Sequence, residues 1–358
     1  MKTNSLIQPL VFDNLDIIGD IHGEIDALNR LLDHLGYSLN QPHNSNRKLA
    51  FIGDFCDRGP NSPEVIFRVK ELVDSGQGIA ILGNHEVNLL VDDAKDGSGW
   101  YFPNRYQSDL ENYAPFKLAS EYEKKLIYQF LNALPIAYEN PQLRLIHAAW
   151  EPNAVEKIKP LPIGCIKSHH LECQRKIAFL AKETGLQKRY EETMEKWGPK
   201  LEDPTQSPPW LEAIAQYDQL EAQTNPIKIV TSGVETTAKQ QFFSGNRWRY
   251  SDRLPWWNYY DGDPYVVIGH FWRLLQPEKH QEKSRYSQLF NKIPPLSWHG
   301  NNNKVFCVDY SVGARWRDRK HGISNENSRY HLAALQWPEN TVVLDSGKRY
   351  PLSPLIRE

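Results

Sequence analysis

Residues 49–59 read Leu-Ala-Phe-Ile-Gly-Asp-Phe-Cys-Asp-Arg-Gly, an apolar run that passes directly into glycine and charged side chains. Two other stretches repeat this pattern, because apolar runs also lead into Gly-Asp-Ile-His-Gly at residues 19–23 and into Gly-Asn-His-Glu at residues 83–86. Short apolar runs bounded by glycine and polar residues predict buried strands. Each run therefore presents polar side chains at a strand end, which is where ligands bind in open α/β sheets.

Segments with helical spacing follow these runs. Apolar side chains recur every three or four positions over residues 25–35 and again over residues 65–72. Strand-like runs that alternate with such segments predict an α/β fold. We expect buried strands at residues 15–18, 49–52, 79–82, 143–146, 227–230 and 265–268.

The middle of the chain has a different composition. Residues 168–223 are charged and rich in helix formers, with a proline-rich break at residues 203–209 and no clear strand pattern. We predict a single domain over residues 1–358 that contains a helical insertion at residues 155–226, and the sequence leaves open whether this insertion is a lid, a docking surface or a dimer contact. Residues 276–303 mix Pro, Lys, Gln and Asn without periodicity, which predicts a long surface loop.

The charge balance argues against some classes of partner. The 358-residue chain has 42 basic and 44 acidic residues and a formal net charge of −2, so no overall basic field favours nucleic acid or an anionic membrane. The N-terminal stretch lacks a basic segment followed by a long apolar one, and no stretch approaches the ~20 apolar residues of a membrane span. We therefore expect a cytoplasmic protein. The four cysteines form no compact framework and are expected to be reduced, buried thiols: Cys56, Cys165, Cys173 and Cys307.

Five strand ends carry side chains that bind metals. Besides the three motifs above, apolar runs precede His147 and the pair Gly269-His270. Carboxylate, amide oxygen and imidazole, without thiolate, suit Mn, Fe, Zn or Mg, and the number of ligands is sufficient for two ions. Each fragment alone has an ordinary explanation, since Gly-Asp is common in turns and a lone histidine after an apolar run usually belongs to the core. The five fragments together favour a metal site.

These motifs resemble those of calcineurin-like metallophosphoesterases, in the branch of serine/threonine phosphoprotein phosphatases and diadenosine tetraphosphatases. The resemblance rests on Gly-Asp-x-His-Gly, Gly-Asp-x-x-Asp-Arg-Gly and Gly-Asn-His-Glu, with His-Ala-Ala-Trp at 147–150 and Gly-His-Phe-Trp at 269–272. The later motifs, with Cys-Val-Asp-Tyr-Ser at 307–311, further resemble a little-characterised bacterial subgroup. The resemblance covers residues 15–150 and about 227–312. It implies a four-layer αββα sandwich, in which two mixed sheets are flanked by helices.

The resemblance also implies two divalent metal ions, with manganese expected and iron, zinc and magnesium as alternatives. Asp54 would bridge the two ions. The first ion would take Asp20 and His22, and the second would take Asn84, His147 and His270. Many relatives outside this branch have a second histidine at the position of Trp272, and its absence here favours the phosphatase branch.

Three further residues are candidates for the chemistry of phosphate ester hydrolysis. Two nearby cations can bind phosphate oxygens, lower the pKa of a water between them to ~7 and place the resulting hydroxide in line for attack. We expect His85 to protonate the leaving oxygen, with Asp57 orienting it and favouring its protonated form. The planar guanidinium of Arg58 can grip two phosphate oxygens, although an arginine in such a place can also form a surface salt bridge.

Other candidates are weaker. Arg249 or Arg253, in an aromatic-rich stretch, could supply a second phosphate clamp, but a packed hairpin explains this stretch equally well. Glu86 is expected to hydrogen-bond within the site rather than to bind metal. One local cluster has a spacing that is not standard for zinc, and we expect no zinc there: Cys165, His169, His170 and Cys173.

The leading functional prediction is a phosphate monoesterase similar to serine/threonine phosphatases, acting on a phosphoprotein or a small phosphorylated molecule. A symmetrical dinucleoside tetraphosphate hydrolase is the alternative with the same metals. A third hypothesis, from a different functional class, is an inactive binding module on the same fold. The complete set of ligand residues argues against it.

Overall fold

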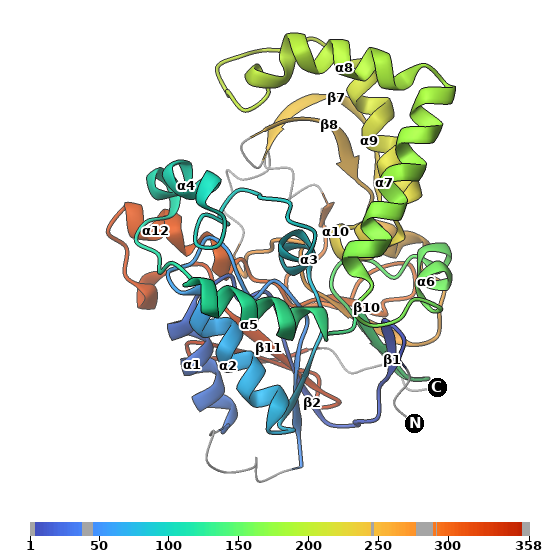
Figure 1. The fold of residues 1–358 in the computed structure, drawn as a ribbon. Coiled ribbons are helices and arrows are strands. Elements are labelled where there is room, and N and C mark those ends of the chain that lie inside the picture. The colour runs from blue at the N-terminus through green and yellow to red at the C-terminus, as the bar shows by residue number, and fades with distance from the viewer. Residues whose placement is uncertain (1–3, 38–45, 245–246, 277–288, 291, 353–358) are drawn as a thin grey trace.

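The computed structural model describes the chain except residues 1–3, 38–45, 245–246, 277–288, 291 and 353–358. Two sheets form its centre, and helices cover them (Figure 1). Among the described residues, no helix has the length and apolar character needed to cross a membrane.

The first sheet holds the strands of the N-terminal motifs. Strands β2, β3 and β4 form one side of this sheet and are parallel, and antiparallel strands complete the other side. Because β2, β3 and β4 run in the same direction, their carboxyl ends meet at one edge of the sheet. In spatial order, the sheet comprises β13 (Arg349–Pro351), β12 (Thr341–Leu344), β11 (Ala333–Trp337), β2 (Leu15–Ile18), β3 (Lys48–Phe51) and β4 (Gly78–Ala80).

The second sheet supplies the later motifs. Strands β6, β9 and β10 are parallel neighbours, so their carboxyl ends also share an edge. The strands are, in order, β1 (Ile7–Pro9), β5 (Ala137–Glu139), β6 (Leu143–Ile146), β9 (Tyr265–Ile268) and β10 (Val305–Cys307). A separate hairpin pairs β7 (Glu235–Ser244) with β8 (Arg247–Arg253).

Side chains of successive strand residues alternate between two buried layers. Ile17 of β2 belongs to the same apolar cluster as Leu145 of β6 and Val267 of β9, so this cluster fills the space between the sheets. The next residue, Ile18, belongs instead to the cluster that contains Leu28 of the first helix. Since side chains alternate along a strand, one face of each sheet packs on the other sheet and the opposite face packs on helices. The predicted four-layer αββα fold is confirmed.

The helices begin and end at local signals such as the cap at Asn61, whose side chain accepts a hydrogen bond from the backbone nitrogen of Glu64. The helices are α1 (Ile25–Leu35), α2 (Ser62–Asp74), α3 (Asn84–Leu90), α4 (Tyr106–Tyr113), α5 (Glu121–Asn132), α6 (Pro152–Ile158), α7 (Ile166–Glu183), α8 (Leu186–Trp197), α9 (Glu212–Thr224), α10 (Pro226–Ser232) and α12 (Arg315–Lys320). Short 3₁₀ turns lie at η1 (Pro103–Arg105), η2 (Gly198–Lys200), η3 (Trp256–Tyr259), η5 (Val312–Ala314) and η6 (Asn325–Asn327).

One predicted strand is wrong. Residues 227–230 lie in helix α10, not in a sheet. The side chain of Asn225 accepts a hydrogen bond from the backbone nitrogen of Lys228, and Pro226 occupies the first turn, where its fixed φ suits a helix. A four-residue apolar run cannot distinguish a buried strand from a buried helix by periodicity, so the cap and the proline were the better signals. The other five predicted strands are confirmed to within a few residues at their ends.

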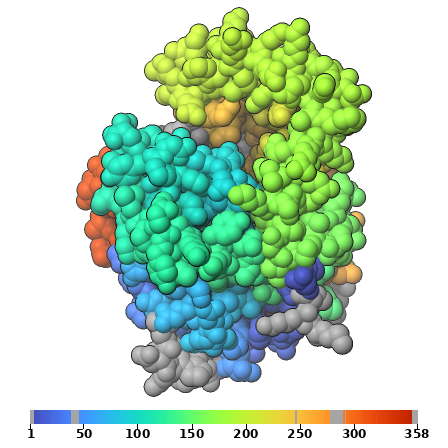
Figure 2. Space-filling view, viewed as in Figure 1, coloured from blue at the N-terminus to red at the C-terminus, as the bar shows by residue number. Residues whose placement is uncertain are grey.

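The middle of the chain is helical, as predicted, and stands above the sheets with the hairpin β7–β8 (Figure 1). In Figure 2 this part overhangs the body of the molecule, with the hairpin set back beneath α8. It has its own small apolar cluster, in which Tyr250 of β8 packs with Leu201 and Leu211. A single domain with an insertion at residues 155–226 remains our proposal for the organisation of the chain.

The expected surface loop at residues 276–303 is described only in part. Residues 277–288 and 291 lie outside the described residues. Within 292–303 the backbone forms turns, and His299 makes an isolated antiparallel bridge to Val305. No helix or strand is therefore assigned to residues 292–303.

Candidate active site

The predicted ligands meet where the two sheets present their strand ends to each other. Asp54, which follows β3, lies at the centre. Its Oδ2 is 3.3 Å from Nε2 of His147, 3.8 Å from Nε2 of His22 and 3.9 Å from Nε2 of His85. Asp54 thereby belongs to two groups of potential ligands whose atoms lie within 4.8 Å of one another, one with His22 and His85 and one with His147 and His270. A carboxylate shared by two such groups matches the position expected of a bridging ligand.

Backbone carbonyl groups fix the orientation of two of these imidazoles. Nδ1 of His22 is 2.9 Å from the carbonyl oxygen of Cys56, and Nδ1 of His147 is 2.7 Å from that of Ile52. A carbonyl oxygen only accepts hydrogen bonds, so Nδ1 carries the hydrogen in both rings. Each ring therefore turns Nε2 towards Asp54, the arrangement that protein metal sites use to hold a histidine ligand.

Asn84 and Asp20 are the remaining predicted ligands, and both lie against these histidines. Oδ1 of Asn84 is 2.8 Å from Nδ1 of His270 and 3.3 Å from Nε2 of His147. Both carboxylate oxygens of Asp20 accept a hydrogen bond from the backbone nitrogen of His270, each at 3.0 Å. All six predicted ligands therefore lie in one cluster, although they come from five strand ends.

The cluster has the chemistry of a cation site. Nε2 of His270 is buried and has no hydrogen-bond partner among the described residues. Burial lowers the pKa of His147, but the neighbouring Asp54 outweighs this and raises that pKa to about 10, so the carboxylates favour positive charge here. Buried carboxylates, imidazoles and an amide oxygen are a donor set that fits hard-to-borderline divalent cations.

The backbone is strained at the same place. Five of the predicted site residues adopt the left-handed conformation that side chains other than glycine rarely take: His22, Asp54, Asp57, Arg58 and His270. Such residues each cost roughly 1–3 kcal/mol and persist only where the surroundings hold them. A Cβ at Gly53, whose φ is +95°, would lie 2.4 Å from the backbone nitrogen of Gly83. Glycine at position 53 thus allows the loops that carry Asp54 and Asn84 to lie close together.

His85 and Asp57 form the expected pair. Nδ1 of His85 lies 2.5 Å from Oδ2 of Asp57. Burial lowers the pKa of His85, but Asp54 and Asp57 more than compensate, and the net shift is upward. The pair therefore favours the protonated imidazole, the form that can donate a proton.

Trp100 was not expected in the site. Its Nε1 donates a 2.6 Å hydrogen bond to Oδ1 of Asp57, the oxygen that does not face His85. Both oxygens of this buried carboxylate are thus occupied, which fixes the plane of the carboxylate. The sequence gives no signal for this role, because Trp100 lies 43 residues after Asp57 and is one of 11 tryptophans.

Arg58 points into the cluster. Its two terminal nitrogens lie 3.0 Å from Nε2 of His22 and 3.1 Å from Nε2 of His85. Its guanidinium carbon is 5.2 Å from the ring centroid of Trp272, and its backbone nitrogen donates to the carbonyl oxygen of Gly97. The side chain faces the candidate metal ligands, which contradicts the alternative that Arg58 forms a surface salt bridge.

Glu86 has the supporting position that was expected. Its carboxylate accepts hydrogen bonds from the backbone nitrogens of Asp54, Phe55 and Gly83 at 2.8 to 2.9 Å. It is fully buried and lies outside both potential ligand groups. Glu86 therefore holds the loop that carries Asp54 against the start of α3.

Asp309 also lies beside the site, although it was quoted above only as part of the motif at residues 307–311 and no role was predicted for it. It follows β10, is buried, and accepts a 2.7 Å hydrogen bond from the backbone nitrogen of Ser311. Burial and the neighbouring Asp309 raise the pKa of Asp20 well above its ordinary value. A signal was available in this case, because Asp309 follows an apolar run in the same way as the other site residues.

The two weaker arginine candidates differ in position. Burial lowers the pKa of His270, and the charge of Arg253 lowers it further, so Arg253 lies near the site. Its guanidinium carbon is 5.8 Å from the ring centroid of Phe271. Arg249 instead donates to the backbone oxygen of Ser244 within the hairpin.

The cysteine and histidine cluster does not assemble as a zinc site. Sγ of Cys173 lies 3.5 Å from Nε2 of His169, but the described residues contain only the two groups around Asp54 in which three such ligands gather. All four cysteines are free thiols, and Cys165 is only half-buried, so the expectation of burial is wrong for that residue.

A family model for calcineurin-like phosphoesterases matches residues 14–271. This range contains all nine predicted metal-binding and catalytic residues. The chain belongs to the calcineurin-like phosphoesterase family. The predicted family is confirmed, and the geometry above describes the candidate site of a member of that family.

Other phosphoesterases resemble parts of the chain. The asymmetrical bis(5'-nucleosyl)-tetraphosphatase PrpE of Oceanobacillus iheyensis is 45% identical over 74 residues, which are 20% of this chain and 30% of that protein. The protein of the same name from Bacillus subtilis is 42% identical over 73 residues, again 20% of this chain and 30% of the relative. The chain thus covers less than a third of each of these two relatives. A solved cold-active protein-tyrosine phosphatase of a psychrophilic Shewanella species has a TM-score of 0.42 and 14% identity, over 96% of this chain and 82% of that one.

Proposed function

We propose that the protein is a metal-dependent phosphoric ester hydrolase that acts on phosphate monoesters. The observation that carries the proposal is the position of Asp54, shared by two groups of ligands, beside the pair of His85 and Asp57. Asp20, His22, Asn84, His147 and His270 would hold two divalent cations, for which manganese is our first choice, together with Asp54. When bound, such ions neutralise phosphate charge and activate water.

The side chains around the ligands have separate tasks. Arg58 binds the phosphate, since a guanidinium can donate two parallel hydrogen bonds to its oxygens. His85 gives its proton to the leaving oxygen from the nitrogen that faces the site, Nε2. Asp57 and Trp100 hold the imidazole in the orientation that this transfer needs.

A dinucleoside tetraphosphate hydrolase is the second candidate. It is favoured by the names of the two relatives above, both of which are asymmetrical tetraphosphatases. The similarity therefore favours asymmetrical cleavage over the symmetrical cleavage expected from the motifs. An inactive module is disfavoured, because the cluster retains every predicted ligand and the His85–Asp57 pair.

The test is an assay of metal-stripped protein that is reconstituted separately with manganese, magnesium, zinc or iron. The substrates are an aryl phosphate monoester, its diester and diadenosine tetraphosphate, and Asp54→Asn is the control. Monoester turnover that is lost in Asp54→Asn would support the first candidate, and selective cleavage of the dinucleotide would replace it with the second. A protein that binds two metals and turns over none of the three would contradict both.

A further inference from the structure

One contact of the Arg58 guanidinium involves neither the predicted ligands nor the pair of His85 and Asp57. The guanidinium carbon lies 5.2 Å from the ring centroid of Trp272, within the ~6 Å over which a cation is attracted to an indole face. The side chain that is the candidate for phosphate binding is thus stacked on an aromatic ring. This stack joins Arg58 to a residue that has no assigned role.

Two hydrogen bonds of the same guanidinium compete with the proposed chemistry. Nη1 lies 3.0 Å from Nε2 of His22, and Nη2 lies 3.1 Å from Nε2 of His85. In the proposed function, Nε2 of His22 binds a metal ion and Nε2 of His85 carries the proton for the leaving oxygen. A ring nitrogen that binds a metal ion or carries a proton cannot also accept a hydrogen bond from Arg58. The contact with the Trp272 ring depends on neither nitrogen, so it persists when both are engaged.

The segment that follows β9 places the Trp272 ring. Phe271 is fully buried, and its ring packs edge-on against Trp257, with 5.2 Å between the ring centroids. Trp272, the next residue, is half-buried, and its ring faces Arg58. The anchored Phe271 fixes the backbone on which Trp272 is carried. This one segment therefore supplies a candidate metal ligand, His270, and the ring that contacts Arg58.

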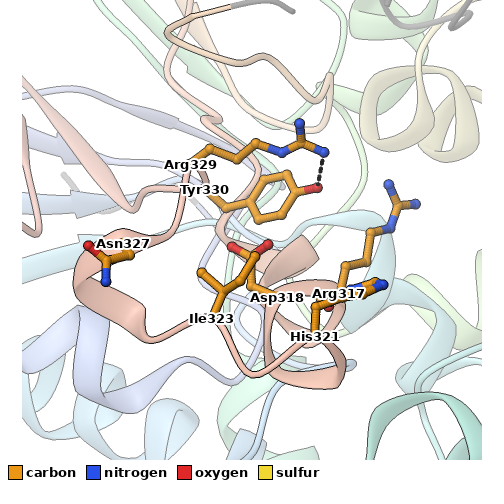
Figure 3. A pocket seen from close by; sticks show the side chains of 7 residues that line it. All are labelled: Arg317, Asp318, His321, Ile323, Asn327, Arg329 and Tyr330. Atoms are coloured by element: carbon orange, nitrogen blue, oxygen red, sulfur yellow. Dashed lines mark hydrogen bonds between the residues drawn. The ribbon is translucent and has the colours of Figure 1, made fainter.

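A second guanidinium lies over the same ring. The guanidinium carbon of Arg317, in α12, is 5.7 Å from the ring centroid of Trp272. Figure 3 shows the side chain of Arg317 extending from α12 at the edge of a surface cavity, with its guanidinium apart from the carboxylate of Asp318. The indole therefore contacts one cation that faces the candidate ligands and one that is exposed at the surface.

Helix α12 is held by buried contacts on both sides of its first turn. Arg315 is only 1% exposed, and its Nη2 lies 2.8 Å from Oδ2 of Asp345. The ring of Trp316 packs edge-on against Tyr113 of α4, with 5.1 Å between the ring centroids. Arg317 follows these two anchors directly. Its backbone position is therefore fixed relative to the body of the molecule.

We propose that Trp272 is a positioning residue for phosphate binding, because its ring holds the guanidinium of Arg58 beside the candidate metal ligands while Arg317 holds the ring from the surface side. The inference rests on the proposed phosphoesterase function and adds a residue to it. A guanidinium that is already oriented loses less conformational freedom when it binds a phosphate group. Trp272 therefore strengthens the binding of phosphate and of its esters alike, whatever the leaving group.

The first test is a double-mutant cycle on phosphate binding, in which isothermal titration calorimetry measures orthophosphate binding to the metal-loaded protein. Trp272→Leu should raise the Kd about fivefold, as expected for the loss of one cation–π contact, and Trp272→Phe should restore most of the binding. In an Arg58→Gln background, Trp272→Leu should have almost no further effect, because its role is exerted through Arg58. Metal content and circular dichroism of each variant check that the ligands and the fold are intact.

Arg317 gives a second test that leaves the segment after β9 unchanged. Arg317→Gln should raise the Kd for orthophosphate about twofold, because the ring loses one of its two cation contacts. Lys320→Gln is the matched control and should leave the Kd unchanged. It removes one charge from the same helix, but the amino nitrogen of Lys320 lies over the ring of Trp316 rather than that of Trp272.

Hydrolysis by the metal-loaded enzyme separates positioning from contact with the leaving group. Trp272→Leu should raise KM for p-nitrophenyl phosphate and for an alkyl phosphate by the same factor of about five, with a smaller change in kcat. A larger rise for the aryl ester, whose leaving group could stack on the ring, would overturn the proposal.

Three calorimetric results would also overturn the proposal. They are an equal effect of Trp272→Leu with and without Arg58, equal effects of Arg317→Gln and Lys320→Gln, and the absence of orthophosphate binding to the metal-loaded wild type. If the enzyme hydrolyses no ester, the proposed function fails, but the double-mutant cycle still decides whether Trp272 acts through Arg58.

Discussion

His85 lies beside the candidate metal ligand Asp54 and is paired with Asp57, so it is placed to donate a proton to the leaving oxygen. We expect His85→Asn to lower kcat by roughly 10²- to 10⁴-fold on an alkyl phosphate, whose leaving oxygen needs a proton. The loss should be smaller on p-nitrophenyl phosphate, whose leaving group needs little protonation. Steady-state kinetics with both esters, together with the metal content of the variant, check this. A variant that kept its metal and turned over the alkyl ester at the normal rate would exclude the role.

Trp100 acts through Asp57 rather than on the substrate. Trp100→Phe removes the hydrogen bond to Oδ1 of Asp57 and leaves the His85 contact in place. We expect kcat for the alkyl phosphate to fall about tenfold with little change in KM, because a less firmly held imidazole donates its proton less effectively. Trp210→Phe is the control, since it removes an indole hydrogen bond to the carboxylate of Glu212 in the insertion. Equal effects of the two substitutions would contradict a positioning role for Trp100.

Trp100 and Asp309 also illustrate what could be predicted at the level of single residues. Side chains that directly follow apolar runs were found because strand ends of parallel sheets converge, and Asp309 follows the same rule. Trp100 lies in the loop between α3 and α4 and reaches Asp57 only through the tertiary fold. Contacts of this kind leave no local pattern in the sequence.

At the level of elements, the loop before α4 controls the position of Arg58. Gly97 in this loop has a φ of +90°, and a Cβ there would lie 2.8 Å from Cγ of Arg58. Gly97→Ala should therefore displace the guanidinium and raise KM for a monoester by about tenfold, in line with the loss of a charged hydrogen bond. Gly185→Ala is a close control, because Gly185 also has a positive φ, of +65°, but nothing lies within 4 Å of the added Cβ. A normal KM in Gly97→Ala would refute the steric argument.

The elements that were predicted correctly have clearer apolar patterns in the sequence than the elements that were missed. Strands β2, β6 and β9 are long enough and apolar enough to be identified from the sequence. The hairpin β7–β8 is half-exposed and interrupted by an irregularity between Thr237 and Phe242, so its pattern is broken. Helix α10 was mistaken for a strand because its buried run is short. The sequence therefore predicted the strands that carry ligands better than the parts that surround them.

At the level of the whole molecule, Asp345 ties three parts of the fold together. It follows β12 and pairs with Arg315 of α12 and Arg30 of α1. Burial raises the pKa of Asp345, but contacts with His331, Arg315 and Arg30 lower it by a larger amount, and the net pKa is about 2. A carboxyl pKa that is lower in the folded state stabilises the protein at pH values above 3.8, the ordinary pKa of the group. This contribution is lost as the pH falls towards about 2.

Asp345→Asn should consequently destabilise the protein at neutral pH. Removing one partner of a buried ion pair costs about 3 kcal/mol, so the free energy of unfolding in urea should fall by about that amount at pH 7. The difference between wild type and variant should shrink as the pH is lowered from about 4 to 2, because the wild-type carboxylate is then protonated. Asp263→Asn is a suitable control at an exposed carboxylate. A difference that stays constant over this pH range would show that the ionised carboxylate is not the cause.

The wide separation of the ligands along the chain has a consequence for protein synthesis. The backbone nitrogen of His270 donates to Asp20, although the two residues are 250 positions apart. A growing polypeptide emerges from the ribosome N-terminus first, so the motifs around Asp20, Asp54 and Asn84 are exposed long before β9 is made. The complete ligand set arises only when β9 joins the second sheet. We therefore expect the second of the two proposed ion sites, which needs His147 and His270, to form only after most of the chain has been translated.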